Sequence, residues 1–401
     1  MPQICLYFQL HQPYRLNDFN VFDIGHDASY FQMDGPKSNQ AIFQKVAQKS
    51  YIPMLTLLFQ LTRRFPNFVF ALSCSGVFLE QAMAFEPKVI QLLQQLARTG
   101  QVEFLAETYY HSLASLYSPQ EFERQVRRHQ QTIQKLFGLW PWVFRNTELV
   151  YSNQIGRLVS SLGFKAMLTE AVPRYLHGRA KTQVFTDIDQ NLLLLLKHAE
   201  FSDDIAFRFS DRKWPEYPLT VEKYLSWLEV YPQEHLINLF MDFETFGEHQ
   251  WEDTGIFAFF AALVEKFLAK QWNSFVLPST VLYQHLARLN DKSLTAPIYD
   301  VHNPISWADI DRDLTAWIDN DLQKDVISKV YGLEEKILSH QNAQLIADWR
   351  RLQTSDHFYY MCTKWSADGD VHAYFSPYDS PYEAYRRYSI VLADIHERLL
   401  G

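Results

Sequence analysis

The segment LINLFMDFETFGEHQW, residues 236–251, is the most informative stretch of this sequence for its fold. Residues 236–241 have the length and the apolar content of a buried strand. Asp242 and Glu244 follow that strand directly and stand among aromatic residues. Enzymes built on barrels of parallel strands collect their catalytic groups at the carboxyl ends of the strands. The segment therefore predicts a barrel strand that delivers carboxylates to a site.

Six segments upstream share this strand character, and helical patterns lie between most of them. Alternating strands and helices imply parallel pairing with right-handed crossovers, hence an α/β barrel or an open wound sheet. The predicted strands span residues 4–9, 68–73, 102–106, 143–147, 166–169, 192–197 and 236–241. The predicted helices span residues 51–65, 87–99, 119–137, 153–162 and 221–229, and the apolar run 256–264 suits a buried helix.

The residues that follow the strands favour the barrel over the open sheet, because such groups would meet at one end of a barrel. A simpler interpretation is that polar residues follow strands wherever the chain returns to solvent. That interpretation accounts for any single position better than for the whole set. The set is His11, Ser75, Glu107, His111, Glu148, Glu170, Asp242 and Glu244.

The pattern becomes helical after about residue 290, with a strand-like run only at 371–375. No Gly/Ser-rich or Pro-rich linker precedes this part, so we expect it to pack directly on the barrel. The predicted division is a barrel catalytic domain over residues 1–290 and an α-helical region over residues 291–401. Helices are predicted at residues 305–320, 325–350 and 381–400.

The composition predicts a folded chain with an uncharged partner. Of the 401 residues, 47% are hydrophobic and 15% aromatic, which gives ample apolar surface for a core and excludes disorder and low-complexity scaffolds. The formal net charge is −9, with no block of like charge, which argues against nucleic acid as a partner. The 30 Phe, 22 Tyr and 10 Trp exceed what a core of this size usually requires.

The cysteines and the apolar runs predict the compartment. Cys5, Cys74 and Cys362 form no C-x-x-C pair, the N-terminus lacks a secretory pattern, and no apolar run approaches membrane-spanning length. We therefore expect a cytoplasmic protein with no membrane partner, although a chain already stripped of a signal would look the same. The oligomeric state stays open.

Glu148 and Asp242, each at the end of a predicted strand, can face each other across a barrel mouth. Aromatic neighbours desolvate an acid and raise its pKa. Glycosidic bond cleavage needs one acid to protonate the leaving oxygen and one carboxylate to stabilise or trap the oxocarbenium ion. Structural roles stay open, because Glu148 could pair with Arg145 and Asp242 could cap the following turn.

Other motifs give little support for a cofactor. None of the 14 His is three, four or five residues from another, and the nucleotide-binding and serine-hydrolase motifs are absent. A metal ion held by distant residues such as His11 and His111 stays open, but hydrogen bonding or sugar contact is favoured for them. We predict no metal and no other cofactor.

Several segments together resemble glycoside hydrolase family 57, and within it the α-amylase branch. Five of them match the family's signature regions in order, over nearly the whole chain, and a sixth, SWADIDRDLTAW (306–317), resembles the amylase branch. The five are HQP (11–13), GQVEFLAETYYHSL (100–113), FRNTELVYS (144–152), MDFETFGEHQ (241–250) and LQTSDHFYYM (352–361).

The resemblance implies an incomplete (β/α)7 TIM-like barrel followed by a C-terminal α-helical bundle region that completes the substrate cleft. It implies Glu148 as the nucleophile and Asp242 as the general acid/base of a retaining enzyme that cleaves α-1,4-glucosidic bonds of starch, glycogen or maltooligosaccharides. Both positions are filled, so an inactive relative is not indicated. Glu107 departs from the small residue that many relatives carry there.

The expected substrate-binding residues surround this pair. For each tryptophan among them, packing in the core is an equally good interpretation. They are Gln9, His11, His111, Glu244, His249, Trp251, Trp307, Trp317, Asp356 and His357.

Three alternatives to α-amylase-type hydrolysis stay open. A 4-α-glucanotransferase or a branching enzyme would use the same catalytic pair and pass the sugar to a hydroxyl group instead of water. A metal-dependent deacetylase or mannosidase could be built on a related barrel. A non-catalytic protein would bind the α-glucan without releasing reducing ends.

Overall fold

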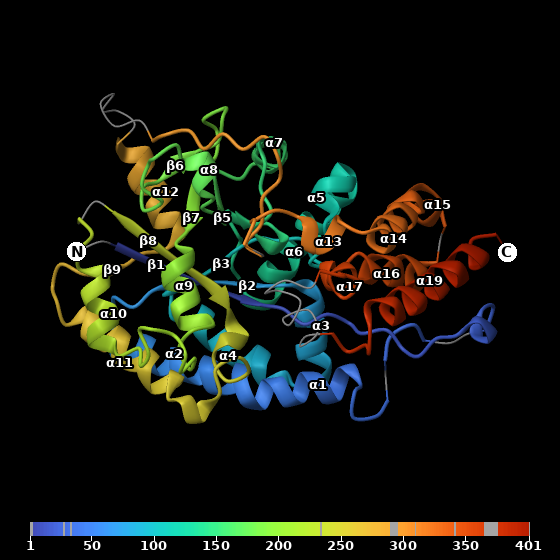
Figure 1. Ribbon diagram of the computed structural model, residues 1–401, viewed down its shortest axis with the longest axis horizontal. Coiled ribbons are helices and arrows are strands. Elements are labelled where there is room, and N and C mark those ends of the chain that lie inside the picture. The colour runs from blue at the N-terminus through green and yellow to red at the C-terminus, as the bar shows by residue number, and fades with distance from the viewer. Residues whose placement is uncertain are drawn as a thin grey trace.

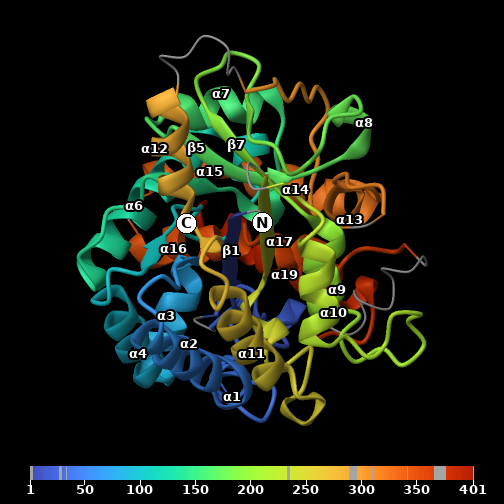
Figure 2. The same cartoon turned by 90° about the vertical axis from the view of Figure 1, so that its left-hand side faces the viewer.

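The computed structural model of the chain describes residues 3–26, 29–32, 34–232, 235–288, 296–308, 310–340, 342–364 and 376–400. Helices surround a central sheet, and the C-terminal helices α14, α16 and α19 lie side by side at the end of the molecule opposite the N-terminus (Figure 1). Seen from the N-terminal side, the strands lie in the centre with helices on both sides (Figure 2). None of the described helices is both long and apolar enough to cross a lipid bilayer.

The seven predicted strands are confirmed, and they form an incomplete TIM-like barrel. They pair in parallel in the order β3-β2-β1-β8-β7-β5-β4. A parallel bridge between Ala106 and Phe144 joins the two outer strands and closes the ring. The strands are β1 (Gln3–Leu10), β2 (Phe70–Cys74), β3 (Val102–Phe104), β4 (Val143–Arg145), β5 (Ala166–Glu170), β7 (Leu193–Lys197) and β8 (Leu236–Asp242); short β6 (Phe185–Thr186) and β9 (Ser274–Phe275) pair with β7 and β1.

The strands also determine how the inside of the barrel is filled. Side chains alternate between the two faces of a strand, so residues two apart share a face. One apolar cluster inside the barrel contains one residue from each of the seven strands or from the residue just after the strand. These residues are Tyr7, Ala71, Leu105, Val143, Leu168, Leu195 and Phe240. Two residues further along each strand, toward its carboxyl end, stand polar residues: Gln9, Ser73, Glu107, Arg145, Glu170, Lys197 and Asp242. The barrel therefore has an apolar floor and a polar, largely charged layer above it.

The helices cover the outer faces of the strands. Two large apolar cores lie between helices and sheet, one around α2, α4 and α11, the other around α6, α7 and the C-terminal helices. The helices are α1 (Asn39–Val46), α2 (Ile52–Arg64), α3 (Gly76–Phe85), α4 (Pro87–Ala97), α5 (Ala114–Tyr117), α6 (Pro119–Phe137), α7 (Asn153–Ser161), α8 (Pro173–Leu176), α9 (Ala199–Ala206), α10 (Val221–Leu228), α11 (Ile256–Leu268), α12 (Pro278–Arg288), α13 (Thr315–Ile318), α14 (Asp321–Gly332), α15 (Glu334–Ser339), α16 (Ala343–Leu352), α17 (Ser355–Tyr359) and α19 (Pro381–Arg398).

The C-terminal helices share a core with the barrel. Trp349 and Tyr388 belong to the same apolar cluster as Phe144, Met167 and Leu194 of the strands. The helical region thus packs directly on the barrel, as the missing linker predicts. The proposed domain division at residue 290 remains a prediction.

Two of the predicted C-terminal helices differ from the structure. The helix predicted at 305–320 is wrong except for α13, because Ile305 forms a backbone bridge with Tyr151 and the Ser306 hydroxyl donates to the Asp313 carbonyl. The helix predicted at 325–350 is divided among α14, α15 and α16, because the Asn342 side chain caps a new helix. The strand-like run at 371–375 lies outside the described residues, whereas the helix predicted at 381–400 is confirmed as α19.

Candidate active site

A cavity of about 490 Å³ opens at the carboxyl ends of the barrel strands. Its walls come from strand ends, from the loop after β8, from α17 and from Trp307, Ala308, Ile310 and Arg312. All but two of the residues predicted for the site line it. The predicted residues that line the cavity are Gln9, His11, His111, Glu148, Asp242, Glu244, His249, Trp307, Trp317 and Asp356.

Trp251 and His357 do not line the cavity. The indole of Trp251 is 56% exposed, donates to the Glu248 carbonyl and lies 5.6 Å from the Lys49 ammonium. His357 is buried, with its ring 5.6 Å from that of Tyr388 in the helical core. Successive residues of a helix point about 100° apart, so His357 lies away from the cavity that its neighbour lines.

Glu148 lies in the short turn η3 (Thr147–Leu149) that follows β4. Both Glu148 and Leu149 have left-handed backbone conformations, with φ of 55° and 52°. Non-glycine residues adopt this conformation at a free-energy cost that the surrounding structure must offset, and such positions cluster at functional sites. The turn directs the Glu148 side chain into the cavity.

Three donors from distant segments hold the Glu148 carboxylate. The Trp307 indole N–H donates to Oε2 at 2.8 Å, and the Ser355 hydroxyl donates to Oε1 at 3.0 Å. His111 Nε2 lies 3.4 Å from Oε1. Burial raises the pKa of Glu148, but the hydrogen bond and charge of His111 outweigh burial and hold the pKa below its ordinary value. Glu148 is therefore an ionised, oriented carboxylate.

The pKa of Asp242, at the end of β8, is shifted in the opposite direction from that of Glu148. Burial and the negative charge of Glu148 raise the pKa of Asp242 to about 6. Although Asp242 precedes a short 3-10 turn, its side chain makes no capping hydrogen bond there. Two neighbouring carboxyls with pKa values moved apart can serve as one base or nucleophile and one acid.

Glu244 adds a second protonated acid beside Asp242. Burial and the charge of Asp242 raise the pKa of Glu244 to about 8. The Tyr51 hydroxyl donates to Glu244 Oε1 from the end of a π-helical turn, η2 (Ala47–Tyr51). Glu244 is thus neutral at the pH where Asp242 titrates, and it adds no negative charge there.

Two buried cations lie against the ring of Trp307. The Arg145 guanidinium is 5.1 Å from the ring centroid and the Lys197 ammonium is 5.3 Å from it. Arg145 is fully buried, and none of its guanidinium nitrogens has a hydrogen-bond partner among the described residues. Arg145 makes no ion pair with Glu148 within that part of the chain, but its positive charge still favours the ionised form of Glu148.

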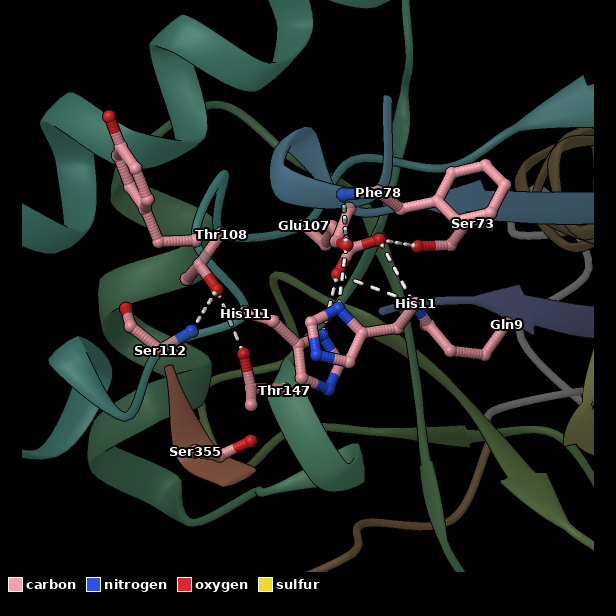
Figure 3. Close-up of polar contacts among 12 residues, drawn as sticks. Gln9, His11, Ser73, Phe78, Glu107, Thr108, His111, Ser112, Thr147 and Ser355 are labelled. Atoms are coloured by element: carbon pink, nitrogen blue, oxygen red, sulfur yellow. Dashed lines mark hydrogen bonds and ion pairs between the residues drawn. The ribbon is translucent and has the colours of Figure 1, made fainter. Parts of the chain in front are cut away.

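His11 and Asp356 form a second pair beside His111. His11 Nε2 is 2.9 Å from Asp356 Oδ2, and its Nδ1 is 2.7 Å from the Ser75 hydroxyl. The rings of His11 and His111 stack with centroids 3.9 Å apart (Figure 3). Burial and the charge of His111 hold the pKa of His11 below its ordinary value.

Sequence reasoning missed four residues that complete the site. Lys197 pairs with Asp203 at 3.0 Å, and Arg312 contacts Asp203 at 3.4 Å and also donates to the Trp307 carbonyl, which anchors the loop that carries Trp307. Ser355 precedes Asp356 and reaches Glu148. Lys197 ends a predicted strand, a signal that could have found it. Asp203, Arg312 and Ser355 reach the site only through tertiary packing.

The comparison with known families agrees with this geometry. A model described as glycosyl hydrolase family 57 matches residues 5–296. A Methanocaldococcus jannaschii protein named "Putative alpha-amylase" is 39% identical over 402 residues, which cover 98% of this chain and 83% of that protein.

The chain belongs to glycosyl hydrolase family 57.

Solved structures of a branching enzyme described as a family 57 enzyme and of a 4-alpha-glucanotransferase have the same fold. A branching enzyme from Thermococcus kodakaraensis superposes with a TM-score of 0.68 at 15% identity, over 99% of this chain and 90% of that one. A 4-alpha-glucanotransferase from Thermococcus litoralis superposes with a TM-score of 0.63 at 13% identity, over 89% of this chain and 56% of that one. At such identities the likeness establishes the fold alone.

The family 57 membership makes the chain a glycoside hydrolase, and the donor set at the site is compatible with that chemistry. In the described part of the chain, no three His, Cys, Asp or Glu side chains converge in an arrangement that would hold a metal ion. Both nitrogens of His11 and of His111 instead face protein oxygens. The hydrogen-bonding role favoured from the sequence accounts for these contacts.

Proposed function

We propose that this family 57 enzyme cleaves α-1,4-glucosidic bonds of starch, glycogen or maltooligosaccharides by a retaining double displacement. Glu148 is the nucleophile and Asp242 the general acid/base. The observation that carries the proposal is the contrast between the two carboxyls that line one cavity. Glu148 is held ionised by His111, whereas burial and the Glu148 charge favour the protonated form of Asp242.

In the first step, a Glu148 carboxylate oxygen attacks the anomeric carbon as the bond from that carbon to the glycosidic oxygen breaks. The Asp242 proton moves to the departing oxygen, which leaves as a sugar hydroxyl. The products are a β-glycosyl ester on Glu148 and an ionised Asp242. Trp307 and Ser355 fix the direction of attack, because both donate to the Glu148 carboxylate.

In the second step, Asp242 accepts a proton from water while the water oxygen bonds to the anomeric carbon and the ester bond breaks. Glu148 returns as a carboxylate and Asp242 as an acid, and two inversions retain the α configuration. Esterification removes the negative charge of Glu148, one of the causes that raise the pKa of Asp242. The Asp242 pKa therefore falls after the first step, and Asp242 stays ionised until it accepts the proton from water.

The cavity supplies sugar contacts around this pair. His11 and Asp356 present polar groups at the end of β1 and on α17, and Trp317 and Tyr359 add aromatic surface to the lining. Aromatic faces suit the apolar C–H faces of glucose units. Trp307 has a different task, because its indole N–H is already donated to Glu148 and its ring lies beside two cations.

A glycosyl transferase activity is the second candidate function. It is favoured by the names of the solved structures with this fold, a 4-alpha-glucanotransferase and a branching enzyme. The same two carboxyls would act, and a sugar hydroxyl would replace water in the second step. The difference lies in access of water and acceptor to the cavity.

Incubation with maltoheptaose, with products resolved by size and by anomeric form over time, tests the proposal. We expect shorter maltooligosaccharides that appear first as α anomers, and loss of activity in Glu148→Gln. Glu103→Gln is a matched control, because Glu103 lies on β3 outside the cavity and accepts from the Ser279 amide. Products longer than maltoheptaose would show that the enzyme is a transferase and not a hydrolase. Products that appear first as β anomers would contradict a retaining mechanism.

A further inference from the structure

Glu107, His111 and Glu148 form a continuous line of contacts behind the nucleophile. Glu107 Oε2 is 3.0 Å from His111 Nδ1, and His111 Nε2 is 3.4 Å from Glu148 Oε1. Glu107 itself is fully buried and does not line the cavity. It therefore cannot reach a substrate directly, and His111 is the residue that connects it to Glu148 (Figure 3).

The Glu107 carboxylate is fixed by three neighbouring barrel strands. Gln9 at the end of β1 donates to Oε1 at 3.2 Å, and the Ser73 hydroxyl on β2 donates to the same oxygen. Glu107 follows β3 on the inner face of the barrel. These contacts leave Oε2 directed at His111. A carboxylate with this much support serves as a rigid anion.

The contacts of His111 define its charge. A carboxylate can only accept hydrogen bonds, so a ring whose two nitrogens both face carboxylates must carry a proton on each nitrogen. His111 is therefore an imidazolium, and its left-handed backbone, with φ of 51°, holds the ring in this place. Burial lowers the pKa of His111, but the hydrogen bonds with Glu107 and Glu148 outweigh burial and raise it to about 9.

The contacts of the two neighbouring histidines, His11 and His129, are each satisfied by a neutral ring. His11, stacked on His111, satisfies its nitrogens with one proton, because Asp356 accepts from it and the Ser75 hydroxyl donates to it. His129 on α6 accepts from the Glu107 amide and donates to the Cys74 carbonyl, which also needs one proton. The titratable or charged groups that face this line of contacts are His11, Tyr7, Cys74, His129, Arg145, Asp242 and Asp356.

We propose that Glu107 is a positioning residue that keeps His111 positively charged beside Glu148, so that the nucleophile stays ionised and in place. This inference rests on the proposed function of Glu148. Without the Glu107 charge, a buried imidazole beside the Arg145 cation loses its proton, and a neutral ring no longer opposes protonation of Glu148.

The variant Glu107→Gln keeps the size of the side chain and removes its charge. The first measurement is nitrogen NMR of the whole protein labelled in histidine, with the His111 signals assigned from His111→Gln. We expect both His111 nitrogens to be protonated in the wild type up to about pH 8 and the titration midpoint to fall below neutral in Glu107→Gln. Glu103→Gln is the matched control, because Glu103 is a half-buried glutamate on β3, the strand that Glu107 follows, and it should leave the His111 titration unchanged.

The second measurement is the pH profile of kcat/KM on maltoheptaose. We expect the acid limb, where Glu148 loses activity by protonation, to move up by roughly one pH unit in Glu107→Gln. A purely structural role would lower the rate without moving that limb. A neutral His111 in the wild type at pH 7 would contradict the inference, and this result does not depend on whether a variant folds. The inference would also be wrong if Glu107→Gln changed neither the His111 titration midpoint nor the acid limb of the pH profile. An inactive wild type with a charged His111 would refute the proposed function instead.

Discussion

The indole N–H of Trp307 donates a 2.8 Å hydrogen bond to the carboxylate of Glu148, and the Trp307 amide also donates to the Glu148 carbonyl at 3.1 Å. A residue 159 positions further along the chain thus holds the turn that carries the proposed nucleophile. The loop that contains Trp307 is secured by Arg312 and Asp203. The nucleophile therefore depends on the region that follows the barrel strands.

Trp307→Phe tests this dependence. The phenyl ring keeps an aromatic face for Arg145 and Lys197 but cannot donate to Glu148. A hydrogen bond to a charged group contributes about 1.5–3 kcal/mol, so we expect kcat to fall roughly ten- to a hundredfold with a smaller change in KM. Steady-state kinetics on maltoheptaose measures both constants. Trp251→Phe, at an exposed tryptophan outside the cavity, should keep kcat near the wild-type value.

Asp242→Asn removes the proposed acid and base while it keeps the shape of the side chain. General acid/base groups contribute about 10²–10⁴ in rate, so hydrolysis of maltoheptaose should fall by that order. Azide needs no base to attack the β-glycosyl ester on Glu148, so it should restore turnover of an activated aryl α-glycoside. Because this attack inverts the anomeric carbon a second time, the product should be an α-glycosyl azide. Failure of azide to accelerate the variant would argue against Asp242 as the base.

The pH dependence of kcat/KM follows from the two carboxyls. Asp242 must be protonated in the free enzyme, and its pKa of about 6 sets the limb where activity falls as the pH rises. Glu148 must be ionised, and its pKa below the ordinary value sets the limb where activity falls as the pH drops below about 4.5. A pH profile should therefore have its maximum between these limbs. Full activity at pH 8 would show that Asp242 is not the acid.

We expect Glu103→Gln to make the folded protein more stable at high pH. Burial raises the pKa of Glu103 to about 7, above its value in the unfolded chain. Because the folded pKa is the higher one, the contribution to stability is fully present below about pH 4.5 and is lost as the pH rises toward 7. The variant should therefore unfold at a higher temperature than the wild type at pH 8 and at a similar temperature at pH 4. Thermal unfolding followed by circular dichroism compares the two.

Gly247→Ala tests the packing of the loop after β8. Gly247 has φ of 106°, and a Cβ atom there would lie 1.9 Å from the Lys49 carbonyl oxygen. The positive φ of Gly247 disfavours alanine, and the Lys49 carbonyl oxygen leaves no room for its Cβ atom. We therefore expect a loss of about 2 kcal/mol or more in the free energy of unfolding. Chemical denaturation measures it. Gly178→Ala is the comparison, because its φ is also positive but no atom lies within 4 Å of the added Cβ.

The sequence predicts those features of this chain that local patterns determine. The seven strands follow from apolar runs, and Glu148 and Asp242 stand out because each comes directly after such a run. The contacts of Trp307 and Ser355 with Glu148 are invisible in the sequence, because they join segments that meet only after packing. The same reason explains the wrong helix at 305–320, where pairing of Ile305 with Tyr151 overrides a helical apolar spacing.

The most direct test of the central claim is to identify the carboxylate that carries the sugar. A 5-fluoro-α-glucosyl fluoride forms a glycosyl ester quickly and loses it slowly, so the labelled protein can be digested and its peptides sequenced by mass spectrometry. We expect one sugar per chain, attached to Glu148 in the peptide that contains FRNTELVYS. A label on any other carboxylate, or turnover of the wild type with no covalent label, would contradict the assignment of Glu148 as the nucleophile.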